Sequence, residues 1–167
     1  MEKIFLVLFV ALTTSIANAQ SLKGQWASLQ PIEEQPAYLI FEFQEKDSLE
    51  LGLLFEFEKE NIKLKTLITC KGTYTQEEEE LTIIYKETTI KEDCELNFPE
   101  EYKALLTDED MSQLEQLKIG LASHIKSKFV QILPMLKALE ITNLTDKELK
   151  VSTGNFEMTF LKISSEE

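Results

Sequence analysis

The fold is decided by the stretch LELGLLFEFE, residues 49–58, in which apolar side chains recur at every second position. Neighbouring side chains on a β-strand point to opposite faces, so this alternation places one face in a core and the other in water. The same alternation occurs at residues 37–44 and 81–86. Polar segments typical of turns separate these runs, at residues 45–48, 59–61 and 76–80. Residues 22–97 are therefore predicted to form a meander of antiparallel strands.

The longest predicted strand covers residues 62–74, although its alternation is imperfect. Ile62 and Leu64 keep one phase, and Leu67 falls in the other. A bulge near Thr66 and Leu67 would explain the change of phase, and bulges bend the strands of barrels. We therefore predict a long strand with one bulge.

The period changes from two to three or four after Thr107. This residue, with three acids behind it, is typical of a helix N-cap. One apolar stripe follows, at Met111, Leu114, Leu117, Leu121, Ile125, Phe129 and Ile132. Gly120 leaves open one long helix or two short ones, and Pro134 predicts an end or kink at about Leu133. We expect the stripe to pack on the sheet, because the polar face carries both signs of charge and is a poor membrane surface.

Two strands are predicted to close the chain. Residues 139–151 contain a polar turn at 143–146, and Gly154-Asn155 marks a hairpin before the alternation resumes at residues 156–160. We therefore expect a mainly β (α+β) fold, in which an antiparallel meander closes into a roughly eight-stranded barrel. The helical insertion at about residues 107–133 stands before the last strands.

Residues 1–19 are predicted to be a signal peptide. A short charged start precedes the apolar residues 4–16, and Ala17 and Ala19 place small side chains at −3 and −1 before Gln20. The apolar run is too short for the roughly 30 Å of a bilayer core. We expect cleavage after Ala19, export to the periplasm or the medium, and a single domain over residues 20–167 without a membrane span.

Cys70 and Cys94 are an even pair, and in an oxidising compartment such a pair predicts a disulfide. A closed loop of about 25 residues would stabilise the fold by roughly 3 kcal/mol. A metal site has less support, because His124 is the only histidine and neither cysteine belongs to a CxxC pair. A nucleophilic cysteine would lack a nearby base in the sequence.

The charge of the chain excludes one class of partner. Its 167 residues include 30 acids and 17 basic residues, all lysines, for a net charge of −13. Such a chain repels phosphate backbones and lacks the arginine fork that binds phosphates and guanines, so we expect no nucleic-acid binding. Its 43% of apolar residues is enough for one core and argues against disorder.

Several short segments carry a resemblance to a known family. Residues 22–26, Leu-Lys-Gly-Gln-Trp, place a G-x-W pattern on the first strand, and residues 71–75, 81–83 and 141–163 add to it. With these segments the chain resembles the small secreted lipocalin-like domains of Bacteroidetes, within the calycin group of β-barrels. The resemblance implies that Trp26 plugs the closed end of the barrel and that Gly24 lets the backbone approach it.

The chain departs from lipocalins at two places. Lipocalins carry an arginine near the last strand that stacks on the tryptophan, and here Lys162 is the only nearby candidate. The helical segment at residues 107–133 stands before the last strands, whereas a lipocalin usually carries its helix after the barrel. The resemblance covers most of residues 21–163.

No catalytic motif is present in the sequence. It contains no G-x-S-x-G, P-loop or His-x-x-x-His pattern, and its many carboxylates single out no pair. We therefore expect neither an enzyme nor a cofactor or metal. His124 lies one position before Ile125 of the stripe, so we expect it to be exposed or at a packing boundary. The acidic run at residues 77–80 is expected to be a solvated hairpin tip, with a calcium site as the lesser alternative.

We expect a binding protein. An eight-stranded barrel either fills with its own side chains or holds one small ligand, and the sequence leaves both open. A cavity would suit a hydrophobic small molecule, with Tyr74 or Tyr85 as its polar group. The predicted lining is Phe41, Phe43, Leu53, Phe55, Phe57, Tyr74, Leu81, Ile83, Tyr85, Met158 and Phe160. The alternative is a protein-interaction module, such as an inhibitor or envelope assembly factor, whose filled barrel binds a basic partner through its acidic surface.

Overall fold

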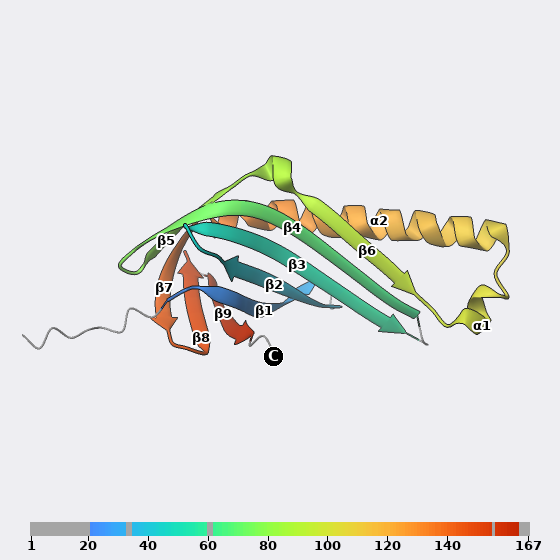
Figure 1. The fold of residues 1–167 in the computed structure, drawn as a ribbon, viewed down its shortest axis with the longest axis horizontal. Coiled ribbons are helices and arrows are strands. Elements are labelled where there is room, and N and C mark those ends of the chain that lie inside the picture. Colours follow the sequence, from blue (N-terminus) through green and yellow to red (C-terminus); the bar gives the residue numbers. More distant parts are fainter. Residues whose placement is uncertain (1–20, 33–34, 60–61, 155, 164–167) are drawn as a thin grey trace, which may run out of the picture.

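The computed structural model describes residues 21–32, 35–59, 62–154 and 156–163 (Figure 1). The strands are β1 (Gly24–Ile32), β2 (Gln35–Phe43), β3 (Ser48–Lys59), β4 (Ile62–Glu77), β5 (Glu80–Tyr85), β6 (Lys91–Asn97), β7 (Ala138–Leu144), β8 (Glu148–Thr153) and β9 (Phe156–Ile163). The helices are α1 (Glu100–Lys103) and α2 (Asp108–Ile132), with short 3-10 turns η1 (Glu87–Thr89) and η2 (Leu133–Leu136). The predicted signal peptide and its cleavage site between Ala19 and Gln20 lie outside the described residues.

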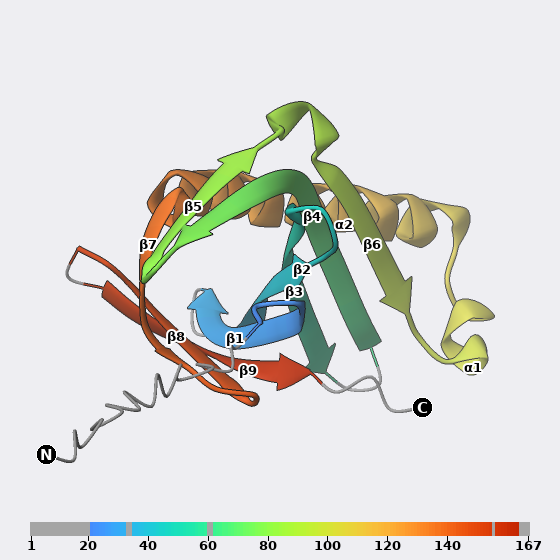
Figure 2. The same ribbon diagram turned by 60° about the vertical axis from the view of Figure 1, so that its left-hand side comes forward.

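Eight strands form a closed antiparallel barrel. They follow the chain in the order β1, β2, β3, β4, β5, β7, β8 and β9, and β9 returns to pair with β1 (Figure 2). This confirms the predicted mainly β fold, a meander that closes into an eight-stranded barrel with a helix inserted before the last strands. The turns at residues 44–47 and 145–147 and the hairpin at Gly154, whose φ is 59°, also lie where the sequence predicts them.

Strand β4 divides the barrel wall. Its first half, residues 63–69, pairs with β6, and its second half, residues 72–77, pairs with β5. β6 pairs with no other described strand. β5 reaches β7 over three residue pairs only, residues 80–82 with residues 138–140. The wall therefore separates between β6 and β7, and another element must cover the inner face of β4.

That element is α2, a single helix that runs through Gly120. Its N-cap is a capping box: the Thr107 hydroxyl accepts from the Asp110 N–H at 3.2 Å, and the Asp110 carboxylate accepts from the Thr107 N–H at 2.8 Å. Pro134 lies in η2, directly after the helix ends at Ile132, as predicted. No helix among the described residues is long and apolar enough to cross a membrane.

The C-terminal half of α2 packs into the barrel core. Ile125 and Phe129 are buried in the same cluster as the barrel residues, and Leu133 and Leu136 of η2 join them. Across the sheet, Lys126 forms an ion pair with Glu92 of β6 at 3.1 Å. The predicted packing of the stripe on the sheet therefore holds for this half of the helix. Two predicted stripe residues, Met111 and Leu117, are instead exposed. Met111 belongs to the N-terminal end of α2, which extends past the sheet (Figures 1 and 2). Leu117 lies about a third of a turn around the helix from the buried Phe129, so it faces away from the sheet.

The prediction of a bulge in β4 is wrong, because the strand has none. The register between β3 and β4 is regular from Ser48 opposite Thr73 to Lys59 opposite Ile62. Leu67 simply faces outward, opposite Leu54 of β3, where the two side chains are half-buried. A leucine pair on the outer face produced the change of phase that the sequence suggested. A register shift occurs elsewhere, between β7 and β8.

The predicted disulfide is not formed in this structure, where Cys70 and Cys94 are free thiols. Cys94 of β6 lies opposite Thr66 of β4, and Cys70 is four residues farther along β4. At about 3.3 Å per residue, Thr66 and Cys70 lie about 13 Å apart, whereas a disulfide needs Cα atoms within about 7 Å. The Cys70 thiol instead approaches the hydroxyl of Thr89 at 3.8 Å, and the Cys94 thiol approaches that of Thr66 at 3.1 Å.

Trp26 is fully buried near the start of β1. Its indole N–H donates to the carbonyl of Leu22 at 2.6 Å, and the Lys162 ammonium of β9 lies 4.9 Å from the ring centroid. Gly24 has a φ of 117°, and a Cβ built there would lie 3.0 Å from Lys162 Cε. A side chain at position 24 would therefore be strained and would crowd the lysine. Lys162, the only nearby cation in the sequence, lies over the ring of the tryptophan.

We expect the purified chain to contain two free thiols of unequal reactivity. Burial raises the pKa of the Cys70 thiol, so less of it is the reactive thiolate, whereas Cys94 is partly exposed. Native alkylation followed by peptide mass spectrometry should label Cys94 first and Cys70 only after denaturation. An intact mass two hydrogens below that of the reduced chain would contradict the structure.

Lys162→Met should lower the free energy of unfolding by about 0.5–2 kcal/mol, because it removes the cation from the face of Trp26. The measurement is urea denaturation followed by the fluorescence of Trp26, the only tryptophan in the chain. Lys147→Met is the matched control, since Lys147 is exposed, and it should change stability by less than about 0.5 kcal/mol. Equal effects of the two substitutions would show that the contact with Trp26 does not stabilise the fold.

Candidate functional site

The residues predicted to line the barrel converge on one apolar cluster. Eight are buried in it: Phe41, Phe43, Leu53, Phe55, Leu81, Ile83, Met158 and Phe160. The other three, Phe57, Tyr74 and Tyr85, are partly buried and pack against it. The strands bring these side chains together because each points inward at every second position. Whether they bind a ligand stays a prediction.

Aromatic rings from β2, β4 and β9 contact one another in this cluster. The ring centroid of Phe41 on β2 lies 4.7 Å from that of Phe160 on β9 and 5.5 Å from that of Phe43. Phe43 in turn meets the edge of Tyr74 on β4 at 4.9 Å. In each contact between strands, one strand separates the two partners in the sheet. Rings at such distances are in van der Waals contact, which favours a barrel filled by its own side chains.

Tyr85 carries the one unsatisfied polar atom found among the buried side chains of the described residues. Its hydroxyl is shielded from solvent and has no hydrogen-bond partner. Burial raises the pKa of Tyr85 well above its usual range, and the nearby Cys70 adds to the effect. The Tyr74 hydroxyl differs, because its pKa is raised more weakly, by burial and by Asp47. A buried hydroxyl without a partner is costly, so Tyr85 is the polar group in the barrel with an unused capacity to bind.

The pockets of the described residues lie at the rims and outer faces of the barrel. The largest of the five considered, about 820 Å³, lies between the start of β1 and the end of β9, beside Leu161 and Ile163. None of the five is lined by Phe41, Leu53 or Phe160. The arrangement thus favours binding on the outside of the barrel over binding within it.

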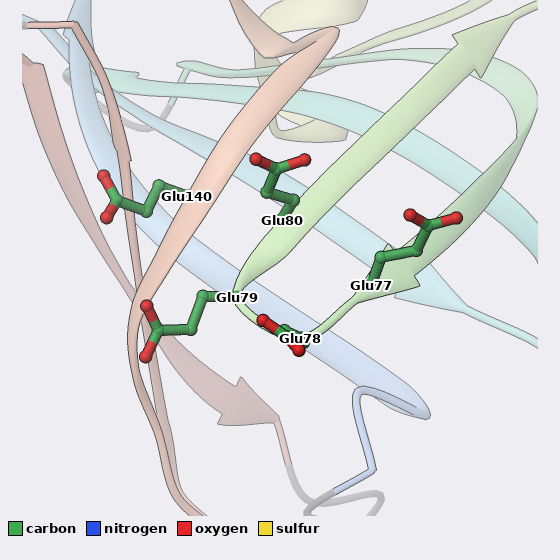
Figure 3. Close-up of a pocket in the computed structure, with 5 residues that line it drawn as sticks. All are labelled: Glu77, Glu78, Glu79, Glu80 and Glu140. Atoms are coloured by element: carbon green, nitrogen blue, oxygen red, sulfur yellow. The ribbon is translucent and has the colours of Figure 1, made fainter.

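An acidic pocket of about 550 Å³ lies at the hairpin between β4 and β5. Figure 3 shows the five glutamates that line it, at positions 77, 78, 79, 80 and 140, with carboxylates that point in different directions. All five are exposed. No group of three or more ligating side chains within the described residues is arranged to hold a metal ion. This hairpin tip is exposed to solvent, as the sequence predicts.

The sequence did not reveal one exposed apolar surface of the described residues. It lies where α1 turns into α2, and it includes Tyr102, Leu105 and Met111. The helical stripe predicted Met111 to be buried, and nothing in the spacing shows where the sheet beneath the helix ends. His124, by contrast, lies on the exposed side of α2, in line with its place beside the stripe.

Comparison with known proteins adds no function to this arrangement. No family model matches the chain. No curated protein matches it either. The site must therefore be interpreted from its own geometry.

Proposed function

We propose that this chain is an exported, lipocalin-like binding protein whose barrel is filled by its own side chains and which binds a basic protein partner through its acidic surface. The observation that carries the proposal is the packing of Phe41 against Phe43 and Phe160 in the barrel interior. A core filled in this way leaves the outer surface for recognition. Residues 1–19 have the features of a signal peptide and support export to the periplasm or the medium.

The charge of the surface supports the choice of partner. The chain has 30 acids against 17 lysines, and the ion pairs between them join exposed side chains. The lysines are too few to neutralise the acids, so a net charge of −13 acts over distance. A strongly negative surface attracts basic proteins and raises their rate of association, in a manner that salt weakens.

A second candidate function follows from Tyr85. Its buried hydroxyl has no partner, and a ligand oxygen inside the barrel would satisfy it. Under this second proposal the barrel carries one hydrophobic small molecule with a polar end, and the apolar side chains around Tyr85 would hold its tail.

Native mass spectrometry of the protein from an exporting host tests the first proposal. We expect a bare chain, since the interior is filled, and no saturable 1:1 binding of a fluorescent fatty acid. The immobilised protein should retain a basic protein from the envelope or medium of its source and release it as NaCl rises from about 50 to about 500 mM. A small molecule retained at 1:1 would contradict a filled barrel. Failure to retain any basic protein would contradict the proposed partner.

Tyr85→Phe separates the two candidates. If the hydroxyl is unsatisfied, the substitution should leave stability unchanged or raise it by up to about 1–3 kcal/mol. Thermal or urea denaturation measures this change, with Tyr102→Phe, on an exposed residue, as the control. A destabilised Tyr85→Phe variant that also loses a co-purifying small molecule would favour the ligand-carrying barrel instead.

A further inference from the structure

We propose that the α1–α2 corner, residues 98–117, binds a basic amphipathic helical segment of the partner protein. The inference rests on the proposed function, because it names the part of the acidic surface that the partner contacts. It is carried by an apolar helix face that extends past its sheet and by the acids around that face.

The N-terminal end of α2 projects beyond the sheet. Its 25 residues span about 38 Å, whereas the seven residues of β6 beneath it span about 23 Å. The two elements run in opposite directions, since Lys126 meets Glu92 and the carbonyl of Lys118 meets Cys94. The first turns of α2 therefore project beyond the end of β6, together with α1 (Figures 1 and 2).

The projecting end of α2 carries an exposed apolar face. Met111 and Phe129 are eighteen residues apart, which is five helical turns, so they lie on the same side of α2. Phe129 is fully buried in the core, but Met111 is 44% exposed because no strand lies beneath it. Leu105 is 80% exposed, and Tyr102 of α1 is exposed in the same corner. The apolar stripe that packs α2 on the barrel thus continues onto a surface without a partner in this structure.

The side chains around that face are mostly acidic. The corner contains six acids and one lysine, and the acids are Glu100, Glu101, Asp108, Glu109, Asp110 and Glu115. The lysine, Lys103, is paired with Glu100 and lies over the ring of Phe98. Hydrogen bonds from Thr107 lower the pKa of Asp110, so that carboxylate stays ionised to a lower pH than an ordinary aspartate. The acids of the first turn also stabilise the helix N-terminus, but Glu100 and Glu101 on α1 do not belong to it.

The apolar face and the acids around it together indicate which kind of partner binds the corner. A second copy of the chain would bring its own net charge of −13 and the same acids, so charge opposes self-association. An anionic membrane is repelled for the same reason. An amphipathic helix with lysine or arginine on one face would place its apolar side on Leu105 and Met111 and its cations on the acids. Ile84 of β5 is also exposed and lies opposite the uncharged Thr73 of β4, so it serves as a control.

The test uses a synthetic peptide of about 18 residues, an amphipathic helix of Leu and Lys, with fluorescence anisotropy as the readout. A peptide of the same pattern with Glu in place of Lys controls for charge, and a scrambled Leu–Lys peptide controls for amphipathicity. We expect the protein to bind the first peptide and neither control. Binding should weaken as NaCl rises from about 50 to about 300 mM.

Two double variants locate the binding site on the protein. Leu105→Gln with Met111→Gln should weaken binding of the Leu–Lys peptide by about tenfold or more, because it removes the apolar contact. Glu101→Gln with Glu109→Gln should weaken it severalfold and reduce its dependence on salt. The matched controls are Ile84→Gln for apolar exposure and Glu78→Gln with Glu79→Gln for charge, and neither should change the affinity. Circular dichroism and the melting temperature confirm that each variant is folded.

The results of these experiments distinguish an error about the binding site at the α1–α2 corner from an error about the proposed function. If the Leu–Lys peptide binds in a salt-dependent manner but the corner variants bind equally well, the corner is wrong and the proposed acidic interaction surface stands. If neither the peptide nor any basic protein binds, both proposals fail. A dimer in sedimentation experiments that Leu105→Gln with Met111→Gln dissociates would overturn the corner in favour of self-association. Binding to vesicles that the same variant abolishes would overturn it in favour of a membrane.

Discussion

The unequal length of neighbouring strands is the constraint on which the rest of this structure depends. One edge of β4 pairs with β3 along twelve residues. The other edge pairs with β6 in its first half and with β5 in its second half. Without a further element, the inner face of β4 around Thr66 and Ile68 would face water. Both residues are fully buried, because α2 covers them. The helix is thus part of the barrel wall, which explains why it stands before the last strands in the chain.

The same arrangement bears on function. An eight-stranded barrel is only just wide enough to hold a ligand, and here α2 and η2 add Phe129, Leu133 and Leu136 to the interior. These side chains belong to the same buried cluster as those of the strands. Under the proposed function, recognition takes place on the outside of the barrel, where acids are numerous and one end of α2 projects beyond the sheet. A small barrel that covers its gap with a long helix thereby gains a surface that the barrel alone would lack.

Much of the fold follows from the spacing of apolar residues. Alternation at residues 49–58 and its neighbours gives the strands, and Thr107 and Pro134 bound the helix within one residue of the observed ends. The errors share one cause, which is that spacing along the chain does not give position across the sheet. The partner of Cys94 depends on the register of β4 and β6, and that register places Thr66 opposite it instead of Cys70. In the same way, the outward Leu67 and the exposed Met111 depend on which side chain or strand lies nearby.

The barrel-lining residues could be predicted from the alternation of apolar residues, but their role could not. Inward positions follow from alternation, and all eleven lie in or against one cluster. Whether they touch one another or surround a space depends on side chains from strands far apart in the sequence, such as Phe41 and Phe160. The corner at residues 98–117 was beyond sequence reasoning, because its exposure results from where β6 ends.

The two narrow joints of the barrel have a consequence for its local stability. β1 meets β9, and β5 meets β7, over three residue pairs each, whereas β3 meets β4 over twelve. These joints separate β7, β8 and β9 from the other strands. Local opening requires the fewest ladder hydrogen bonds to break at such places, so the lowest-energy partial unfolding should detach the three C-terminal strands as one cooperative unit. The three strands of this expected unit follow α2 and η2 directly in the chain.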